Sequence, residues 1–223
     1  MYLQRKINMS IHLLLQHPLF HNFSEAQLRD FLSAFSHSYR NYQKNDILLQ
    51  CGDNMPNIGI LLSGSLLVYN IDESGYSNIV NEIFPPQSFG EALVAAGIAE
   101  SPFSIRAIKD CRVFYLAYQD LITRNNSVYY PLLMANLAQL LAEKVMTMNF
   151  RLVTAAQRKT RDKLLAYLYQ QKQRQKSSTI TLPLNREQLA DYLFVDRSAL
   201  SAVLMKLKKD GLLDYHKNIF TIK

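Results

Sequence analysis

Cysteine is scarce in this sequence, which contains only Cys51 and Cys111. This excludes a framework of several disulfides and favours a reducing compartment, so we expect a cytoplasmic protein. The chain also lacks a continuous apolar run of the ~20 residues that a membrane span needs. No such run follows Met1–Lys6 either, so we expect neither a signal peptide nor a membrane partner.

Residues that bind metals are scarce as well. No histidine lies between Tyr42 and Leu116, where most strands are predicted, whereas a cupin-like metal enzyme would need clustered His and Glu ligands there. Two distant cysteines do not supply the four ligands of an iron–sulfur cluster. His17 and His21 are separated by Pro18 and have no Cys or Asp partner nearby. We therefore predict no metal, no cofactor and no enzymatic activity, and keep the cupin-like enzyme as an alternative.

Glycine and proline are confined to part of the chain. Six of the seven glycines lie from Gly52 to Gly97, whereas residues 132–182 contain neither residue type. The first pattern predicts short strands joined by turns, and the second predicts helices. A capping box at Ser24 also predicts a short helix that runs to Phe35. Many short strands with regular turns are typical of a β-sandwich or roll. The predicted strands are Ile58–Leu62, Ser65–Asn70, Ile79–Phe84, Phe103–Ile108 and Arg112–Leu116, with turns at Ser63-Gly64 and Asp72-Glu73-Ser74-Gly75.

A long helix is predicted from Val128 to Leu152. Its apolar residues recur at steps of three and four and form one stripe, which can bury against its own domain or against a second copy of the chain. Lys144 interrupts the stripe and argues against a simple isolated zipper. A second helix is predicted over Arg158–Gln171, and Gln170–Ser178 reads as a loop or frayed end. The stripe consists of Leu133, Leu137, Leu140, Leu141, Met148 and Leu152.

Positive charge is concentrated in the second half of the chain. Residues 1–125 hold nine Lys and Arg against eleven Asp and Glu, whereas residues 126–223 hold sixteen against seven. This asymmetry favours a polyanion-binding domain attached to a domain with another task. The alternative is a solvated, lysine-rich surface without a ligand.

Two short helices separated by a three-residue break are predicted near the C-terminus. Asn185 and Gln188 can form the capping box of the first helix, Asp196 can cap the second, and Gly211 can end it. The break sets the helices near a right angle, so that the second fits the DNA major groove, ~12 Å wide. Two strands complete a wing around residues 215–218: Leu212–Asp214 and Ile219–Ile222.

The second of these helices carries the candidate base contacts. Arg197 can donate two hydrogen bonds to a guanine edge, and the outward side chains near it are Ser198, Ser201 and Ala202. Lysine and arginine side chains supply charge for phosphates. We expect this domain to bind double-stranded DNA; the alternatives are an adaptor that binds a protein partner and a helical hairpin without a ligand. The candidate phosphate contacts are Arg186, Lys206, Lys208, Lys209 and Lys217.

The chain as a whole resembles the Crp/Fnr-family transcription regulators. The residues that carry the resemblance are Leu189–Leu193 followed by Val195–Ser201, Ile60–Leu66, and Phe89-Gly90-Glu91. It implies an α+β fold: a cyclic-nucleotide-binding-type β-roll over residues 1–126, a dimerisation helix over 127–153, and a winged helix-turn-helix over 154–223. It also implies a cytoplasmic homodimer that reads a pseudo-palindromic site with half-sites about one DNA turn apart. RNA polymerase would be a further partner, and a signal in the roll would reorient the recognition helices.

The resemblance also marks an effector pocket, in which one pair of residues departs from the family. Nucleotide-binding members place an Arg-Ser pair on the cyclic phosphate, but Ser101-Pro102 stands at that place here. Serine brings no positive charge and proline has no backbone donor, so cyclic AMP is not expected as the effector. The effector stays open, and a ligand-independent regulator is an alternative. The implied pocket residues are Phe89, Gly90, Glu91, Ala92, Ser101, Pro102, Arg106 and Thr147.

Other positions depart from the family pattern too. Phe194 stands in the break, where glycine or asparagine is common because that position often needs a positive φ; a bulky residue costs free energy there unless its ring packs locally. Ser198 and Ala202 stand where many members carry Glu and Arg, so the DNA sequence that is read should differ from the best-known consensus. Phe89, with Leu93, Phe103 and Ile105, can line an apolar pocket or belong to the core.

Overall fold

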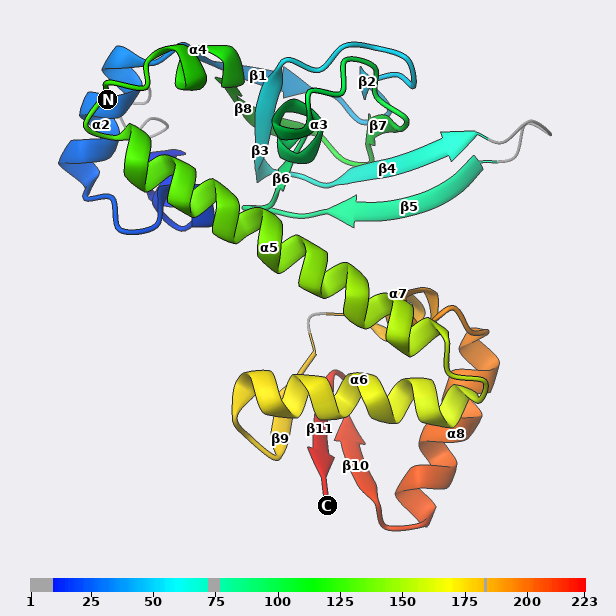
Figure 1. The fold of residues 1–223 in the computed structure, drawn as a ribbon. Coiled ribbons are helices and arrows are strands. Elements are labelled where there is room, and N and C mark those ends of the chain that lie inside the picture. The colour runs from blue at the N-terminus through cyan, green and yellow to red at the C-terminus, as the bar shows by residue number, and fades with distance from the viewer. Residues whose placement is uncertain (1–9, 72–76, 183) are drawn as a thin grey trace. The chain divides into compact units, whose positions relative to one another are not determined.

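A computed structural model of the chain describes residues 10–71, 77–182 and 184–223 (Figure 1). The chain divides into two compact units, Met1–Ala142 and Glu143–Lys223. The boundary falls inside the long helix α5 (Tyr130–Ala155), which therefore contributes to both units instead of forming a separate one. The mixed α and β content confirms the predicted fold class. No helix in the described ranges is long and apolar enough to cross a membrane.

The first unit contains a roll of two four-stranded antiparallel sheets, in the orders β1-β8-β3-β6 and β2-β7-β4-β5. Short helices precede and follow it, and α3 interrupts it (Figure 1). The strands are β1 (His37–Tyr42), β2 (Ile47–Leu49), β3 (Asn57–Ser63), β4 (Leu66–Ile71), β5 (Ser77–Ile83), β6 (Ser88–Phe89), β7 (Ser104–Ala107) and β8 (Cys111–Ala117). The helices are η1 (Pro18–Phe20), α2 (Glu25–Ala34), α3 (Glu91–Ala96) and α4 (Tyr118–Thr123).

The predicted hairpin at Ser63-Gly64 is wrong. β3 pairs with β6 and β8, whereas β4 pairs with β5 and β7, so the turn carries the chain from one sheet to the other. Gly64 has φ +88°, and a Cβ there would lie 2.3 Å from the Asp110 carbonyl oxygen, so this crossing requires glycine. The hairpin partner of β4 is β5; the turn predicted between them, Asp72-Glu73-Ser74-Gly75, lies outside the described residues.

The sheet that contains β3 has apolar side chains on both faces. One face and the facing sheet form the interior of the roll: Leu49, Met55, Leu61, Leu66, Ile83, Phe89, Ile105, Ala107, Cys111, Val113 and Tyr115. The other face packs against the N-terminal helices and the first half of α5. The capping box at Ser24 is present and begins α2, as predicted. Phe20, Phe31 and Phe114 are fully buried in this second cluster. The sequence of β3 is a continuous apolar run because both faces of its sheet are covered.

The long helix α5 corrects the prediction of a single dimerisation stripe. Leu133, Leu137 and Leu140 are buried in the core of their own unit, at 1%, 4% and 6% exposure. Asn136 helps to hold this half of the helix in place, because its Nδ2 donates to the Leu19 and His21 carbonyl oxygens over 3.0 and 2.9 Å. These three leucines therefore have no free surface for a second chain.

The second unit is a helical hairpin and a three-stranded sheet around one core. Its sheet has the order β10-β11-β9, so the wing has a third strand that the sequence analysis missed. Helix α6 runs to Gln175, which corrects the prediction that residues 170–178 are loop. Its elements are α6 (Thr160–Gln175), β9 (Thr179–Thr181), α7 (Arg186–Leu193), α8 (Arg197–Lys209), β10 (Leu213–His216) and β11 (Ile219–Ile222). Its core contains Leu164, Tyr167, Leu168, Leu189, Leu193, Leu200, Leu204, Leu207 and Phe220.

Candidate nucleic-acid interface

The helices α7 and α8 have the predicted caps in all but one respect. Asn185 Oδ1 accepts from Gln188 N over 2.9 Å, and Gln188 Oε1 accepts from Asn185 N over 2.9 Å, which is the predicted capping box. Asp196 has the extended backbone of a cap at the start of α8, but its side chain accepts no hydrogen bond there. At the other end Gly211, with φ +72°, follows the last turn of α8.

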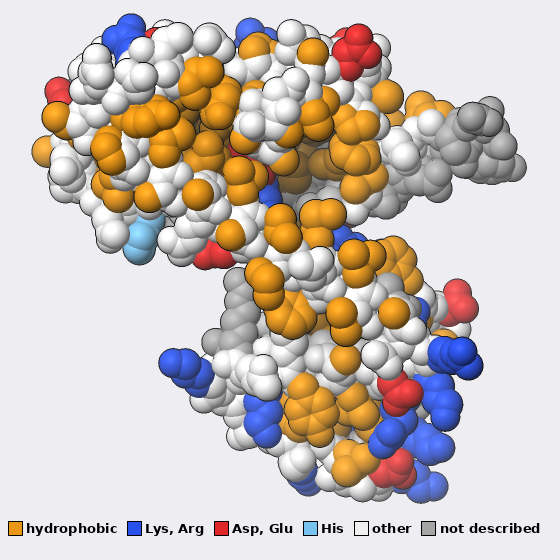
Figure 2. Space-filling model, in the orientation of Figure 1, with side chains coloured by type: hydrophobic (Ala, Val, Ile, Leu, Met, Phe, Trp, Pro, Cys, Tyr) orange, Lys and Arg blue, Asp and Glu red, His pale blue; other side chains and the backbone are white. Residues whose placement is uncertain are grey.

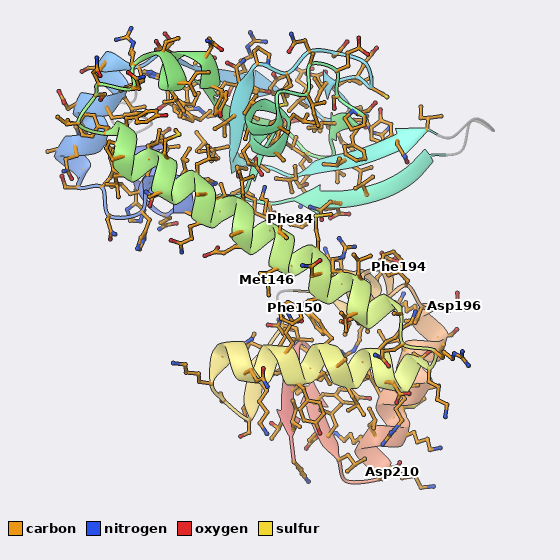
Figure 3. All side chains as sticks on the ribbon, viewed as in Figure 1. Phe84, Met146, Phe150, Phe194, Asp196 and Asp210 are labelled. Atoms are coloured by element: carbon orange, nitrogen blue, oxygen red, sulfur yellow. The ribbon has the colours of Figure 1, made fainter. Side chains whose placement is uncertain are left out.

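The turn between the two helices contains Phe194 in the left-handed region, with φ 52° and ψ 55° (Figure 3). The backbone N–H of Val195 donates to Ala190 O over 3.1 Å, which ends α7. The Phe194 ring is 60% exposed, and the Arg151 guanidinium lies 5.7 Å from its centroid. Lys163 Nζ also donates to the Phe194 carbonyl oxygen over 3.2 Å.

The outward face of α8 presents the predicted base contacts to solvent. Arg197, Ser198, Ala202 and Lys206 are exposed, whereas Leu200, Leu204 and Leu207 are buried on the opposite face. Ser201 is half-buried, and its Oγ donates to the Arg197 carbonyl oxygen over 2.9 Å. Lys and Arg side chains gather along the edge of this unit where α8 lies (Figure 2). This face matches the size and charge of a major-groove reading helix.

The predicted phosphate contacts differ in their surroundings. The Arg186 guanidinium lies 4.8 Å from the Tyr215 ring centroid and 4.7 Å from that of Phe220, and Nη2 donates to Lys217 O over 2.8 Å. Arg186 therefore holds α7 against the wing, and burial lowers its pKa. Lys208 pairs with Asp214 over 2.7 Å. Within the described ranges, no ion pair engages Lys206 or Lys217, so both are available to an anionic partner.

Two loops and a short helix of the first unit position the predicted effector residues. Phe89, Glu91 and Ser101 are buried, whereas Ala92 and Pro102 are exposed. The Ser101 hydroxyl donates to Phe103 O over 2.7 Å and accepts from Phe103 N over 3.2 Å, so its only proton is already used within its own loop.

The remaining two predicted effector residues belong to other elements, β7 and α5. Arg106 is exposed on β7, with its guanidinium 5.6 Å from the Tyr69 ring centroid. Thr147 lies on the half of α5 that belongs to the second unit, where its Oγ1 donates to Glu143 O over 2.8 Å. The loop after α3, residues 97–103, which would receive a cyclic phosphate in the family fold, contains no Lys or Arg.

A cavity of about 250 Å³ opens on the inner side of the roll, lined by residues of β1, β2, β3, β6 and β8 and of the loop before β3. Its polar groups include the Arg40 guanidinium and the hydroxyls of Tyr42 and Tyr115, which lie 2.9 Å apart. Burial and the Tyr42 hydroxyl raise the pKa of Tyr115, so its hydroxyl stays protonated near neutral pH. The other lining residues are Ser38, Leu48, Leu49, Asn54, Met55, Pro56, Asn57 and Phe89.

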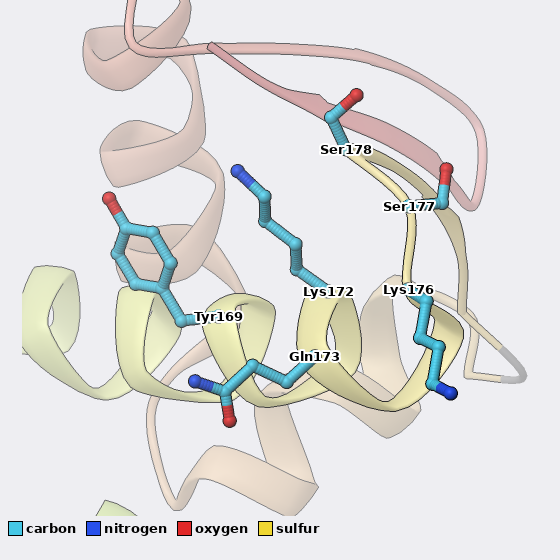
Figure 4. A pocket seen from close by; sticks show the side chains of 6 residues that line it. All are labelled: Tyr169, Lys172, Gln173, Lys176, Ser177 and Ser178. Carbon is cyan, nitrogen blue, oxygen red and sulfur yellow. The ribbon is translucent and has the colours of Figure 1, made fainter.

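A second hollow lies on the second unit, at the end of α6 (Figure 4). It is an open groove of about 410 Å³ lined by Tyr169, Lys172, Gln173, Lys176, Ser177 and Ser178. Two ammonium groups and three hydroxyls can hold an anion there, and none of these groups belongs to α8. The groove therefore adds positive surface without forming an enclosed site.

Each of the two units contains a segment that matches a known domain family. The Cyclic nucleotide-binding domain family matches residues 39–123, and the Crp-like helix-turn-helix domain family matches residues 162–223. The chain belongs to the Crp/Fnr family of transcription regulators.

Relatives of this Crp/Fnr-family chain are distant. The Anaerobic regulatory protein of Aggregatibacter actinomycetemcomitans is 22% identical over 198 residues, which cover 81% of this chain and 70% of the relative. The structure of OCPA-complexed CprK matches with a TM-score of 0.68 and 18% identity, covering 87% of this chain and 88% of the other. The c-di-GMP-responsive regulator CLP of Xanthomonas campestris matches with a TM-score of 0.60 and 16% identity, covering 89% and 99%. These structural likenesses show the fold.

Arg151 lies beside the helix-turn-helix of this Crp/Fnr-family chain but was not among the predicted site residues. Its guanidinium lies 5.0 Å from the Tyr192 ring centroid as well as near Phe194, so the end of α5 contacts the turn that precedes α8. The cavity around Arg40 was missed too. An alternating strand pattern could have placed Arg40 and Tyr42 on one face of β1, but that strand was not predicted.

Replacing Phe194 with asparagine should stabilise the second unit. Asparagine tolerates the left-handed backbone that Phe194 adopts, and an ordinary side chain loses about 1–2 kcal/mol there. After the Arg151 contact is lost we expect a net gain of about 1 kcal/mol, which raises the Tm by roughly 4 °C. Thermal unfolding checks this, with Phe84→Asn as the control, because Phe84 is also exposed but has no positive φ. A Phe194→Asn variant no more stable than the control would contradict the strain argument.

Proposed function

We propose that this regulator acts as a homodimer that binds a pseudo-palindromic DNA site through helix α8 and changes transcription in response to a ligand of its first unit. The observation that carries the proposal is the exposed start of α8. Arg197 and Ser198 lie there free of protein contacts that would hide them, on a helix whose opposite face is buried. RNA polymerase is the further partner we expect, and the cytoplasm the expected compartment.

The electrostatics of α8 and the wing support DNA over a protein partner. Lys206 and Lys209 are exposed basic groups on α8 itself, and Lys217 is an exposed basic group in the turn between β10 and β11. Phosphates along a groove are spaced to meet charges that flank a recognition helix. In a dimer the same groups appear twice, so six or more phosphates can be contacted.

The second half of α5 supports homodimerisation. Val145, Met148 and Leu152 are spaced three and four residues apart and are 55%, 64% and 67% exposed. Met146, Phe150 and Val153 extend this apolar surface, at 41–59% exposure. An apolar stripe with coiled-coil spacing that its own chain leaves uncovered suits a parallel copy of the same helix. A dimer through α5 would give the two α8 helices the two-fold symmetry of a palindrome.

The signal that the first unit binds is, by our proposal, not a cyclic nucleotide. The residues at the place of the family's phosphate contacts are Ser101, whose hydroxyl is used locally, and Pro102. A buried phosphate without a cation would carry a large desolvation cost. Two regulators of similar fold are described as OCPA-complexed and as c-di-GMP-responsive, so ligands other than cyclic AMP occur on this fold.

Salt-dependent DNA binding tests the proposal. A duplex selected from a randomised pool is titrated with the purified protein at several salt concentrations, followed by fluorescence anisotropy. With six or more phosphate contacts, log K should fall against log salt with a slope of roughly −5 or steeper. The selected duplex should also bind at least about 10³-fold more tightly than a scrambled one. A flat salt dependence, or equal affinity for both duplexes, would favour the adaptor alternative instead.

A further inference from the structure

The cavity inside the roll combines one arginine, a pair of tyrosine hydroxyls and an apolar wall. We infer that it binds a small organic carboxylate, with Arg40 as the counter-ion, and that this ligand is the signal of the regulator. This inference names the ligand of the proposed function, and its claim about signalling rests on that proposed function. The residues that line it do not include Glu91 or Ser101, where the family fold would place a nucleotide, although Met55 lies beside Gly90.

The charge of the cavity points to an anion. Arg40 is opposite Val113 in the β1–β8 register, and Val113 belongs to the interior of the roll, so Arg40 lies on the same face of the sheet, where it is exposed to solvent. No Asp or Glu is among the residues that line the cavity. Within the described ranges no carboxylate pairs with Arg40, whose nearest described partner is the Tyr115 ring, 5.8 Å from the guanidinium carbon. The guanidinium therefore keeps all its donors for water or a ligand.

The two tyrosine hydroxyls favour a ligand that can accept a hydrogen bond. Tyr42 and Tyr115 share one hydrogen bond of 2.9 Å, which uses one of their two hydroxyl protons and leaves the other to donate. The raised pKa of Tyr115 keeps the proton of its own hydroxyl in place. A carboxylate or a phosphate can accept from a guanidinium fork and a hydroxyl at once. The apolar side chains that line the cavity favour the carboxylate, which carries less charge than a phosphate and can be attached to an apolar body.

The size and wall of the cavity set the rest of the ligand. About 250 Å³ is the volume of roughly eight waters in the liquid, which leaves room for about ten non-hydrogen atoms. Leu48, Leu49, Met55 and Phe89 provide apolar contacts. A monocarboxylate with a short aliphatic or single-ring body therefore satisfies both ends of the site.

The position of the cavity suits a signal. Tyr115 is near the end of β8, which continues directly into α4 and then, after a short connection, into α5. Ser36, which precedes β1, also donates its backbone N–H to Asp120 of α4 over 2.7 Å. A ligand that orders β1 and β8 therefore acts on strands that are tied to the start of the helical segment.

The test uses benzoate and hexanoate as probes, with benzamide and hexanamide as uncharged counterparts, in calorimetric titrations of the full-length protein. A ligand of this size should bind with a Kd of roughly 10 μM to 1 mM. We expect at least one acid to bind at least about 10-fold more tightly than its amide. Arg40→Gln should weaken that binding at least about 10-fold, and Arg40→Lys should weaken it less. Tyr42→Phe should also weaken it, and this variant serves as an independent test if Arg40→Gln does not fold.

Arg112→Gln is the matched control. Arg112 lies on the same sheet with its guanidinium over a tyrosine ring, Tyr39, but does not line the cavity. It should leave acid binding unchanged. The inference is overturned if neither acid binds below about 5 mM, if acid and amide bind alike, or if Arg40→Gln and Tyr42→Phe both bind like the parent protein.

DNA binding in the presence and absence of the bound acid separates the two proposals. If the acid shifts DNA affinity at least about 3-fold in the parent protein and not in Arg40→Gln, the ligand is the signal. If DNA affinity is unchanged while Arg40-dependent binding persists, the signalling part fails and the site stands. If the parent protein binds no DNA at all, the proposed function fails, and the calorimetry still decides the site.

Discussion

Replacing Met148 and Leu152 with glutamate is expected to convert the proposed homodimer into a monomer that has lost specific DNA binding. Both side chains are more than 60% exposed on α5, so neither substitution removes a contact within the chain's own core. Glutamate is as good a helix former as leucine or methionine, so α5 should persist. Burying each apolar side chain contributes about 1.5–3 kcal/mol, and a two-fold interface contains each twice. The dimer should weaken by roughly 6 kcal/mol, about four orders of magnitude in Kd.

Analytical ultracentrifugation of the double variant measures the dimer, and anisotropy measures DNA binding. A matched control is the double variant Ile98→Glu and Val128→Glu, which also replaces two exposed apolar residues, at 48% and 84% exposure, outside the exposed half of α5. The control should stay dimeric and bind DNA like the parent protein. A dimeric Met148→Glu, Leu152→Glu variant would show that the subunits associate elsewhere.

The same helix shows what the sequence could and could not predict. The spacing of leucines in α5 predicted an apolar stripe correctly, because the period of a helix determines which residues share a face. The spacing carries no information about which surface covers that face. In the structure Leu133, Leu137 and Leu140 are covered by their own unit, and Met148 and Leu152 are not. Burial within a chain and burial between chains leave the same pattern in one sequence.

The roll shows a related limit at Ser63-Gly64. Two apolar strands joined by a glycine turn predict a hairpin, since local turn geometry is all that a short window contains. Here Gly64 has the expected positive φ, but β3 and β4 pair with strands far away in the sequence. Pairing between distant strands depends on the packing of the whole domain, which no local signal specifies. The caps at Ser24 and Asn185 were predictable because each depends on residues three apart.

The candidate sites also differ in whether the sequence alone could predict them. The predicted reading edge of α8 followed from helix period and caps. Arg197, Ser198 and Ala202 are exposed as expected, whereas Ser201 is half-buried. Arg186 looked equivalent to the lysines by charge, but two aromatic rings that are distant in sequence engage its guanidinium. The cavity around Arg40 needs β1 and β8 side by side, and only the folded sheet brings them together. Sites on one helix can be predicted locally, whereas sites between strands require the topology.

Replacing Arg197 with alanine should reduce specific DNA binding by about 1–3 kcal/mol, a 5- to 150-fold loss in affinity. The loss should fall on the selected duplex and much less on a scrambled one, because a bidentate contact to a guanine edge exists only at the right sequence. The side chain is exposed at the first position of α8, where alanine is well tolerated, so the fold should be unaffected. Anisotropy titrations with both duplexes at one salt concentration measure the ratio of the two affinities.

Lys206→Ala is the control that separates base reading from charge. Lys206 lies on the same helix, is also exposed, and carries the same charge as Arg197. If it contacts phosphate only, its loss weakens binding to both duplexes alike and reduces the salt slope by about 1 for each half-site. Arg197→Ala should instead lower the ratio between selected and scrambled DNA. If both variants weakened both duplexes equally, Arg197 would be a phosphate contact, and the base-reading residues of α8 would have to be sought at Ser198 and Ala202.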